Sequence, residues 1–189
     1  MNESVGLGSV NAQLNVHIAN RPPLERYQNL RSFTVLSPGE IASVAKETGN
    51  HWRKIFNVYA KLVYGLDEKI EYTLCQKKAA ACFNFGSQGH DSWQSYRDAA
   101  LLQAGSDTAL WFSQKFAASR ASSSVQSLHI IMGRQYAASL DLPPMVTFDE
   151  NFSLNRERGI IVVPYFDYRQ LSNKKLEVLV ELLVSLLWS

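Results

Sequence analysis

The sequence predicts an α/β protein, specifically a three-layer α/β/α sandwich around a mostly parallel central sheet. Two observations lead to this prediction. Strand-like and helix-like segments alternate through the last third of the chain, which implies parallel pairing through crossover connections. The strand-like segments are also continuously apolar, which implies a sheet covered on both faces. With 189 residues the chain fits one domain, in which residues 1–12 form a loose lead-in.

The first elements are predicted from periodicity and capping. Residues 13–20 alternate apolar and polar side chains, as in a half-buried strand. Ser37 is a candidate N-cap with Glu40 three residues later, which is a capping-box arrangement, and Gly49 ends the helix that follows. Residues 50–66 repeat apolar side chains at the spacing of one helical face, so we expect an amphipathic helix there.

The middle of the chain combines helices with a polar loop. Another helical stretch is expected from Asp67 to about Phe83, followed by a glycine-containing loop over residues 84–93. The next helix ends at Gly105, and residues 107–113 are typical of a buried strand.

The last third supplies most of the predicted sheet. Its short apolar runs predict strands, and its longer periodic segments predict helices. The expected order is a strand at 127–132, a turn at Gly133, a helix at 134–142, strands at 145–148 and 160–166, and a terminal helix capped by Ser172 that runs to Trp188.

Composition and charge exclude few functions. Hydrophobic residues make up 46% of the chain and charged residues 19%, which is typical of a globular domain. The formal net charge of +2 neither requires nor excludes nucleic acid as a partner. The N-terminus has no cationic segment followed by an apolar core, so we expect no signal peptide. The apolar segment 176–188 is shorter than the roughly 20 residues that span a bilayer, so we expect no membrane partner.

The two cysteines indicate the cellular compartment in which the protein is expected. Cys75 and Cys82 are seven residues apart, and on a helix their Cα atoms would lie about 10 Å apart, too far for a disulfide. Free thiols are typical of a reducing compartment, so we expect a cytoplasmic protein. The cysteines and the scattered histidines do not have zinc-site spacing, and we predict no metal and no cofactor.

Three loops are candidates for a ligand site, because ligands of open parallel sheets bind beyond the carboxyl ends of the strands. They follow the predicted strands at 107–113, 127–132 and 160–163, and the third has the richest composition. The loop after residues 160–163 combines aromatic rings with a carboxylate and a guanidinium group, which could stack on a ring and hold an anion. Alternatively, Asp167 and Arg169 brace the loop and the tyrosines cap the sheet. The loop after residues 127–132 contains a glycine and an arginine that could also bind a ligand. Alternatively, this loop is a generic turn. The predicted ligand-binding residues are Tyr165, Phe166, Tyr168, Arg169, Gly133 and Arg134.

Candidates for catalysis are few. His90 and Asp91 could form a general base and its orienting carboxylate, because neutral imidazole accepts protons near pH 7. The alternative is that Asp91 caps a helix and His90 is exposed. Asp167 is a third candidate, as a group that activates water. The chain has neither a Walker loop nor a nucleophile elbow, so the motifs point to no particular reaction.

Two segments carry a resemblance to a known superfamily. "HIIMGRQYAASLDL" and "GIIVVPYFDYRQLSNKKLEVLVELL" resemble the C-terminal half of the uracil-DNA glycosylase superfamily, where a strand ending in glycine opens a helix and the last strand leads into a proline-containing loop. In that superfamily the last loop typically reads His-Pro-Ser and presses into the DNA minor groove. Val163, Pro164 and Tyr165 occupy the matching place here, so the histidine is absent. The chain as a whole is similar to a small uncharacterised bacterial family of unknown function.

Two hypotheses of different classes follow. In the first, a glycosylase-like α/β domain binds a nucleobase or nucleic acid, with the three aromatic residues of the last loop stacking and Arg134 and Arg169 meeting phosphate. In the second, the protein is a non-enzymatic interaction module or a homodimer, in which the terminal helix and Trp188 pack against a partner.

Overall fold

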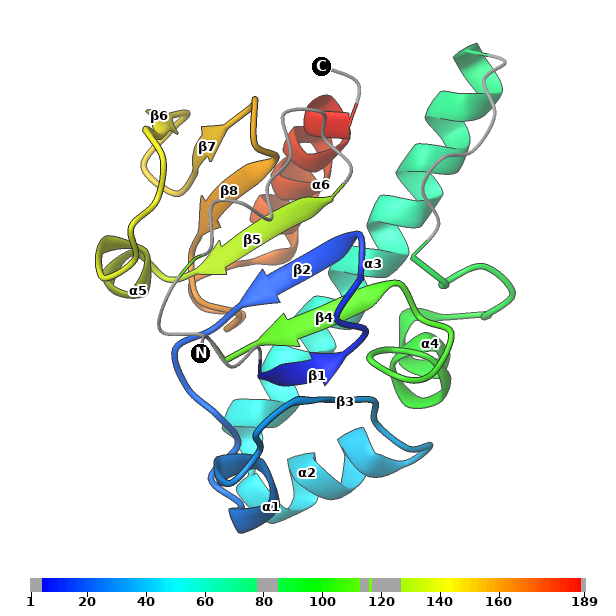
Figure 1. The fold of residues 1–189 in the computed structure, drawn as a ribbon. Coiled ribbons are helices and arrows are strands. Elements are labelled where there is room, and N and C mark those ends of the chain that lie inside the picture. Colours follow the sequence, from blue (N-terminus) through cyan, green and yellow to red (C-terminus); the bar gives the residue numbers. More distant parts are fainter. Residues whose placement is uncertain (1–4, 78–84, 113–115, 117–126, 188–189) are drawn as a thin grey trace.

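A computed structural model describes residues 5–77, 85–112, 116 and 127–187. The described chain forms one eight-stranded sheet in the order β3-β1-β4-β2-β5-β8-β7-β6, with helices packed against it (Figure 1). The strands are β1 (Gly6–Gly8), β2 (Leu14–His17), β3 (Phe33–Thr34), β4 (Thr108–Trp111), β5 (Leu128–Met132), β6 (Val146–Thr147), β7 (Ser153–Asn155) and β8 (Ile160–Val163). This arrangement confirms the α/β class.

The centre of the sheet is parallel. β2 pairs in parallel with β4 on one side and with β5 on the other, and β5 pairs in parallel with β8. Every residue of these four strands is buried, as expected for strands that lie inside a sheet and are covered on both faces. The continuous apolar runs in the sequence predicted β4, β5 and β8. β2 was predicted from its alternating pattern as a half-buried strand, whereas all four of its residues are buried, Asn15 and His17 included.

The flanks make the whole sheet mixed. β1 is antiparallel to β4 and parallel to β3, while β7 is antiparallel to β8 and β6 to β7. A continuous run of parallel pairs is found in the four central strands, whereas both flanks contain antiparallel pairs. The predicted mostly parallel sheet is therefore not confirmed. The flanking strands are two or three residues long, which leaves little periodic signal in the sequence. The predicted strand at 145–148 matches β6, whereas β3 and β7 were not predicted and the buried β1 lies within residues 1–12, which were expected to be a loose lead-in.

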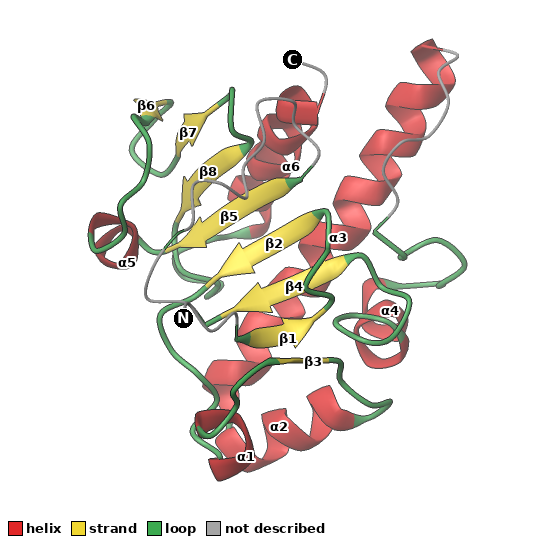
Figure 2. Ribbon diagram, viewed as in Figure 1, coloured by secondary structure: helices red, strands yellow, loops and turns green. Residues whose placement is uncertain are grey.

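Two helices cover one face of the sheet, behind it in the view of Figure 2. They are α3 (Asn50–Lys77) and α6 (Asn173–Leu187), which contact each other and share a core cluster with β2, β5 and β8. The shorter helices are α1 (Glu25–Gln28), α2 (Glu40–Thr48), α4 (Trp93–Ala99) and α5 (Arg134–Ala138).

The opposite face carries a smaller apolar cluster and a polar one. Ile131, Ile160 and Val162 pack with Phe116 and with the segment that contains α5. Beside them, His17 and His129 are both buried, with His17 Nε2 3.1 Å from His129 Nδ1, so two histidines that are far apart in the sequence are partners. Within the described residues no long helix covers this face, and the third layer of the predicted sandwich is not established.

Several helix boundaries differ from the predicted ones. α3 continues through Asp67 as one helix, and the Asp67 carboxylate accepts hydrogen bonds from the Phe85 and Ser87 amides. Gly39, not Ser37, is the N-cap of α2. The part of the predicted helix at 78–83 lies outside the described residues. No helix in the described chain is long and apolar enough to cross a membrane.

Candidate functional site

The connections of the parallel strands define where a ligand site is expected. β2 is followed by β4 on one side of the sheet, whereas β5 is followed by β8 on the other side. The strand order therefore reverses between β2 and β5. In open α/β sheets the ligand crevice lies at such a switch point, outside the carboxyl ends of the strands.

A cavity of about 910 Å³ lies at this point. Its size falls within the range of about 300 to 1,000 Å³ that is common for small-molecule sites. Three carboxyl ends contribute to it, from β2, β5 and β8, together with the turn between β6 and β7 and the start of α6. The lining residues are Ala19, Asn20, Met132, Gly133, Arg134, Gln135, Tyr136, Ser139, Glu150, Asn151, Pro164, Tyr165, Gln170 and Lys175.

Gly133 shapes the turn between β5 and α5. Its φ of +96° lies in the region that side-chain-bearing residues rarely adopt, so glycine suits this turn. The Gly133 amide donates to the Val163 carbonyl at 2.9 Å, which joins the loop after β5 to the end of β8. A Cβ at Gly133 would lie 3.8 Å from the Tyr165 ring, so the turn and Tyr165 are close neighbours.

Tyr165 is held from two sides. Its hydroxyl lies 3.1 Å from His51 Nε2, and the two rings stack with centroids 5.6 Å apart. Burial raises the pKa of Tyr165, and a hydrogen bond with the Asn20 side chain opposes this effect. The ring is therefore positioned by the first turn of α3 and by the loop after β2, and Tyr165 borders the cavity.

The charged groups of the cavity favour an anion. The cavity is lined by two cationic side chains, Arg134 and Lys175, and by one carboxylate, Glu150. Lys175 Nζ donates to Asn151 Oδ1 at 2.8 Å and to the Gln170 carbonyl at 3.1 Å, so its partners are neutral. None of the ion pairs between described residues includes Arg134. A guanidinium group at the cavity wall thus retains its capacity to bind an anion.

The rest of the loop after β8 lies elsewhere. Phe166 has no exposed surface and packs in the core, with its ring 6.2 Å from the Tyr59 ring. Asp167 accepts a hydrogen bond from Lys54 Nζ at 2.7 Å, which lowers the pKa of the carboxyl group, and a second bond from the Arg169 amide. These residues brace the loop, as the alternative interpretation of the sequence proposed for Asp167.

Tyr168 and Arg169 are on the surface of the same loop. The Tyr168 ring is 39% exposed, and Lys61 Nζ lies 5.2 Å from its centroid. Arg169 is exposed as well. Neither residue lines the cavity, although Gln170, which follows them directly, does.

His90 and Asp91 lie at a different part of the surface, in the loop before α4. His90 Nδ1 is 3.4 Å from Ser95 Oγ, and its ring contacts Tyr96. The N-cap of α4 is Ser92, whose Oγ accepts from the Ser95 amide at 3.2 Å, so the predicted Asp91 cap is wrong by one residue. The structure does not bring this pair to the cavity.

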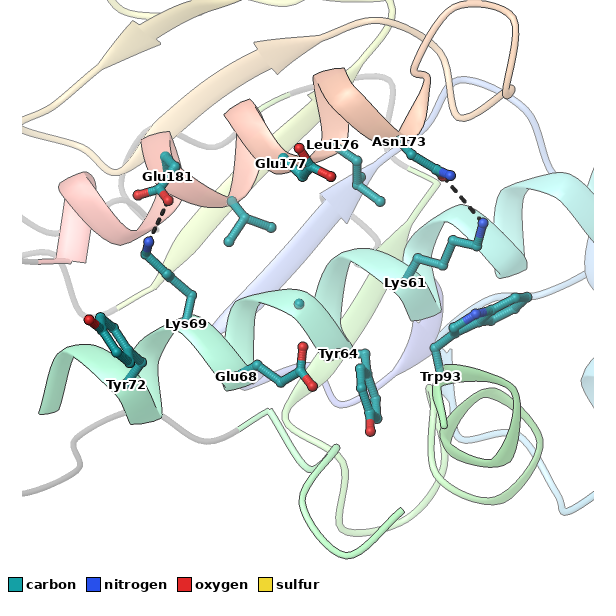
Figure 3. Close-up of a pocket in the computed structure, with 12 residues that line it drawn as sticks. Lys61, Tyr64, Glu68, Lys69, Tyr72, Trp93, Asn173, Leu176, Glu177 and Glu181 are labelled. Atoms are coloured by element: carbon teal, nitrogen blue, oxygen red, sulfur yellow. Dashed lines mark hydrogen bonds and ion pairs between the residues drawn. The ribbon is translucent and has the colours of Figure 1, made fainter. Parts of the chain in front are cut away.

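A second hollow, of about 700 Å³, lies between α3 and α6 (Figure 3). Its lysines are already paired inside the protein. Lys69 Nζ lies 2.5 Å from Glu181 Oε1, and Lys61 Nζ donates to Asn173 Oδ1 and lies over the Trp93 ring. Lys69 is neutralised by Glu181, and the hollow is lined by three glutamates, Glu68, Glu177 and Glu181, against two lysines, so it does not favour an anion. We therefore place the candidate site at the cavity beside β2 and β5.

Asn20, His51, Glu150, Asn151 and Lys175 belong to the cavity or support it, yet the sequence did not single them out. Asn20 is the last residue of the predicted strand at 13–20, so the strand-end rule could have found it. The others come from the start of α3, a hairpin turn and the start of α6, and no local pattern marks them. Among the described residues no group of three or more His, Cys, Asp or Glu could hold a metal ion.

Fold and site together define an α/β protein with a ligand-sized cavity at the carboxyl edge of its parallel strands. The chain belongs to DUF6942, a family of unknown function whose family model matches residues 5–184. This confirms the predicted membership of an uncharacterised family. Comparison with curated proteins and with solved structures found no match.

Proposed function

We propose that this protein binds a ligand containing a nucleobase and a phosphate in the cavity at the carboxyl ends of β2, β5 and β8. One observation carries the proposal: at the switch point of the sheet, a positioned tyrosine ring and an arginine outside every described ion pair border the same cavity. Tyr165 stacks on the base, and Arg134 binds the phosphate.

The amides of the cavity suit the edge of a base. Asn20, Gln135 and Asn151 line the cavity with side-chain amides. Asn151 Oδ1 already accepts from Lys175 Nζ, so Asn151 offers its NH₂ group, while Gln135 offers both a carbonyl oxygen and an NH₂ group. The Watson–Crick edges of bases present the complementary acceptors and donors. The resemblance to the uracil-DNA glycosylase superfamily supports the same class of ligand, since Gly133 and Pro164, two positions that carry it, both border the cavity.

The proposal is one of binding, without a catalysed reaction. Asp167 is engaged by Lys54, and His90 and Asp91 are not among the residues that line the cavity. Tyr168 and Arg169 lie outside the cavity wall but on the same loop, so we propose that they extend the contact to a longer nucleic acid.

The second hypothesis, an interaction module or homodimer, lacks a comparable observation. The apolar residues of α6 are already buried within one copy of the chain: Leu176, Leu179, Val180, Leu182, Leu183, Val184 and Leu186. Trp188, which was expected to pack against a partner, lies outside the described residues. A cytoplasmic location also remains a prediction, based on the two cysteines.

The test is a fluorescence-anisotropy titration with a labelled twelve-nucleotide oligo(dT), and with its uracil-containing counterpart, at about 50 and 200 mM salt. We expect binding that weakens with salt. Arg134→Ala should weaken it by about tenfold or more and lower the salt slope by about one, as for loss of one phosphate contact.

The control is Arg31→Ala, which removes the same charge from an exposed residue of the loop between α1 and β3. This variant should bind like the wild type. If the wild type does not bind either oligonucleotide at 50 mM salt, or if both variants lose affinity equally, the proposed site is wrong.

A further inference from the structure

The hairpin formed by β6 and β7 exposes apolar side chains next to the cavity. Val146 is 71% exposed and Phe148 is 54% exposed, and both belong to the β6 side of a hairpin whose turn residues Glu150 and Asn151 line the cavity. Of the six exposed large apolar side chains in the described chain, three lie on the two segments that border the cavity: Val146, Phe148 and Tyr168. Exposed apolar surface therefore concentrates beside the site.

The tip of this hairpin is held in place. Asp149 Oδ1 accepts hydrogen bonds from the amides of Asn151 and Phe152, at 2.7 and 2.8 Å. The Phe148 amide donates to the Phe152 carbonyl at 2.9 Å, and Lys175 Nζ bonds Asn151 Oδ1, which ties the tip to α6. Phe148 is thus a solvent-exposed ring on a braced backbone, which limits the conformational entropy that the hairpin would lose when a base stacks against the ring.

We infer that the ligand is single-stranded nucleic acid and not a free nucleotide, with Phe148 stacking on a base next to the one held in the cavity. This inference rests on the proposed function. An exposed aromatic ring beside a groove with cationic groups is the arrangement that sequence-tolerant single-strand binding uses, because every base has a π-face. Arg134 and Lys175 provide the adjacent positive charge, which an apolar protein partner would not require.

The experiment compares one nucleotide with a strand. Binding of the labelled twelve-nucleotide oligo(dT) is followed by anisotropy, and binding of thymidine monophosphate by calorimetry, for the wild type and four variants, one of which is Arg134→Ala. Phe148→Ala should weaken oligo(dT) binding by about 5- to 150-fold, the range for one base stacked on one ring, and leave the nucleotide unaffected. Phe148→Tyr should restore strand binding. Tyr72→Ala removes a ring that is 62% exposed on α3 and should change neither affinity.

The possible outcomes separate the two proposals. If Phe148→Ala binds oligo(dT) like the wild type, the inference is overturned. In that case, a loss of binding of both ligands in Arg134→Ala would still support the cavity as the proposed site. If Phe148→Ala weakens both ligands equally, Phe148 belongs to the cavity itself and the strand inference fails. If the wild type binds neither ligand at low salt, the proposed function falls together with the inference, and the exposed hairpin becomes a candidate protein-binding edge.

Discussion

Gly133 has an unusual backbone conformation and lies at the candidate site. Its positive φ directs the chain from the end of β5 into α5, and its amide bonds the end of β8. The nearest atom to a Cβ placed there is 3.8 Å away, which is ordinary contact, so space does not explain the glycine. The backbone conformation does, because a side chain would strain it.

We therefore expect Gly133→Ala to lower the free energy of unfolding by about 1–3 kcal/mol and to weaken ligand binding, since Arg134 is the next residue. Denaturant unfolding followed by circular dichroism measures the first effect.

Gly65→Ala is the matched control. Gly65 lies inside α3, where a Cβ would meet Val180 at 3.6 Å. Alanine should be neutral there or stabilise by about 0.5–1 kcal/mol. Equal destabilisation by both changes would contradict the backbone argument.

At the scale of elements, short helices and strands depend on their ends more than on their propensities. α4 has seven residues, and the Ser92 hydroxyl satisfies one of its first backbone donors. The sequence offers Asp91 as a candidate for this cap, because aspartate and serine are both good N-caps and they are adjacent here. The choice between them depends on where the preceding loop directs the chain, which is a tertiary property.

Ser92→Ala should cost about 1 kcal/mol of stability, as loss of an N-cap typically does, whereas Asp91→Ala should change stability by less than about half of that amount. Urea unfolding midpoints of the two variants and the wild type provide the measurement. The reverse order, with Asp91→Ala as the more destabilising change, would restore the cap predicted from the sequence.

At the scale of the whole molecule, contacts between distant segments position the loop that borders the cavity. Lys54 on α3 bonds Asp167 after β8 across 113 residues of sequence, and His51 of the same helix bonds Tyr165. A single helix thus holds the loop at two points. Because the α3 contacts also reach α2, α4 and α6, we expect the loop to be coupled to the main core.

This coupling predicts a pH dependence. The Lys54 hydrogen bond lowers the pKa of Asp167 below its usual 3.8, so the ionised carboxylate stabilises the folded state. Its contribution is fully present above about pH 4 and is lost as the pH falls through the lowered pKa. Asp167→Asn should therefore destabilise the protein at pH 7 and progressively less below pH 4. Urea unfolding of the wild type and of Asp167→Asn at pH 7 and at pH 3 tests this prediction. A loss of stability in the variant at pH 3 as large as the loss at pH 7 would contradict it.

The sequence by itself determined the α/β class, the buried strands β4, β5 and β8, and the amphipathic helix beginning near residue 50. These features follow from local periodicity, since burial on one or both faces repeats at a helical or strand spacing. It also indicated the strand-end loops that contain Gly133, Arg134 and Tyr165, because the carboxyl ends of parallel strands converge.

Only the tertiary structure decided which side chains of those loops face the cavity. Phe166 and Tyr165 are adjacent and aromatic, yet one is in the core and the other borders the cavity. The mixed flanks of the sheet, the buried pair of His17 and His129, and the contribution of Asn20, Asn151 and Lys175 likewise arise from contacts between distant segments. No local pattern records such contacts, because their energies depend on which elements pack together and not on neighbours in the sequence.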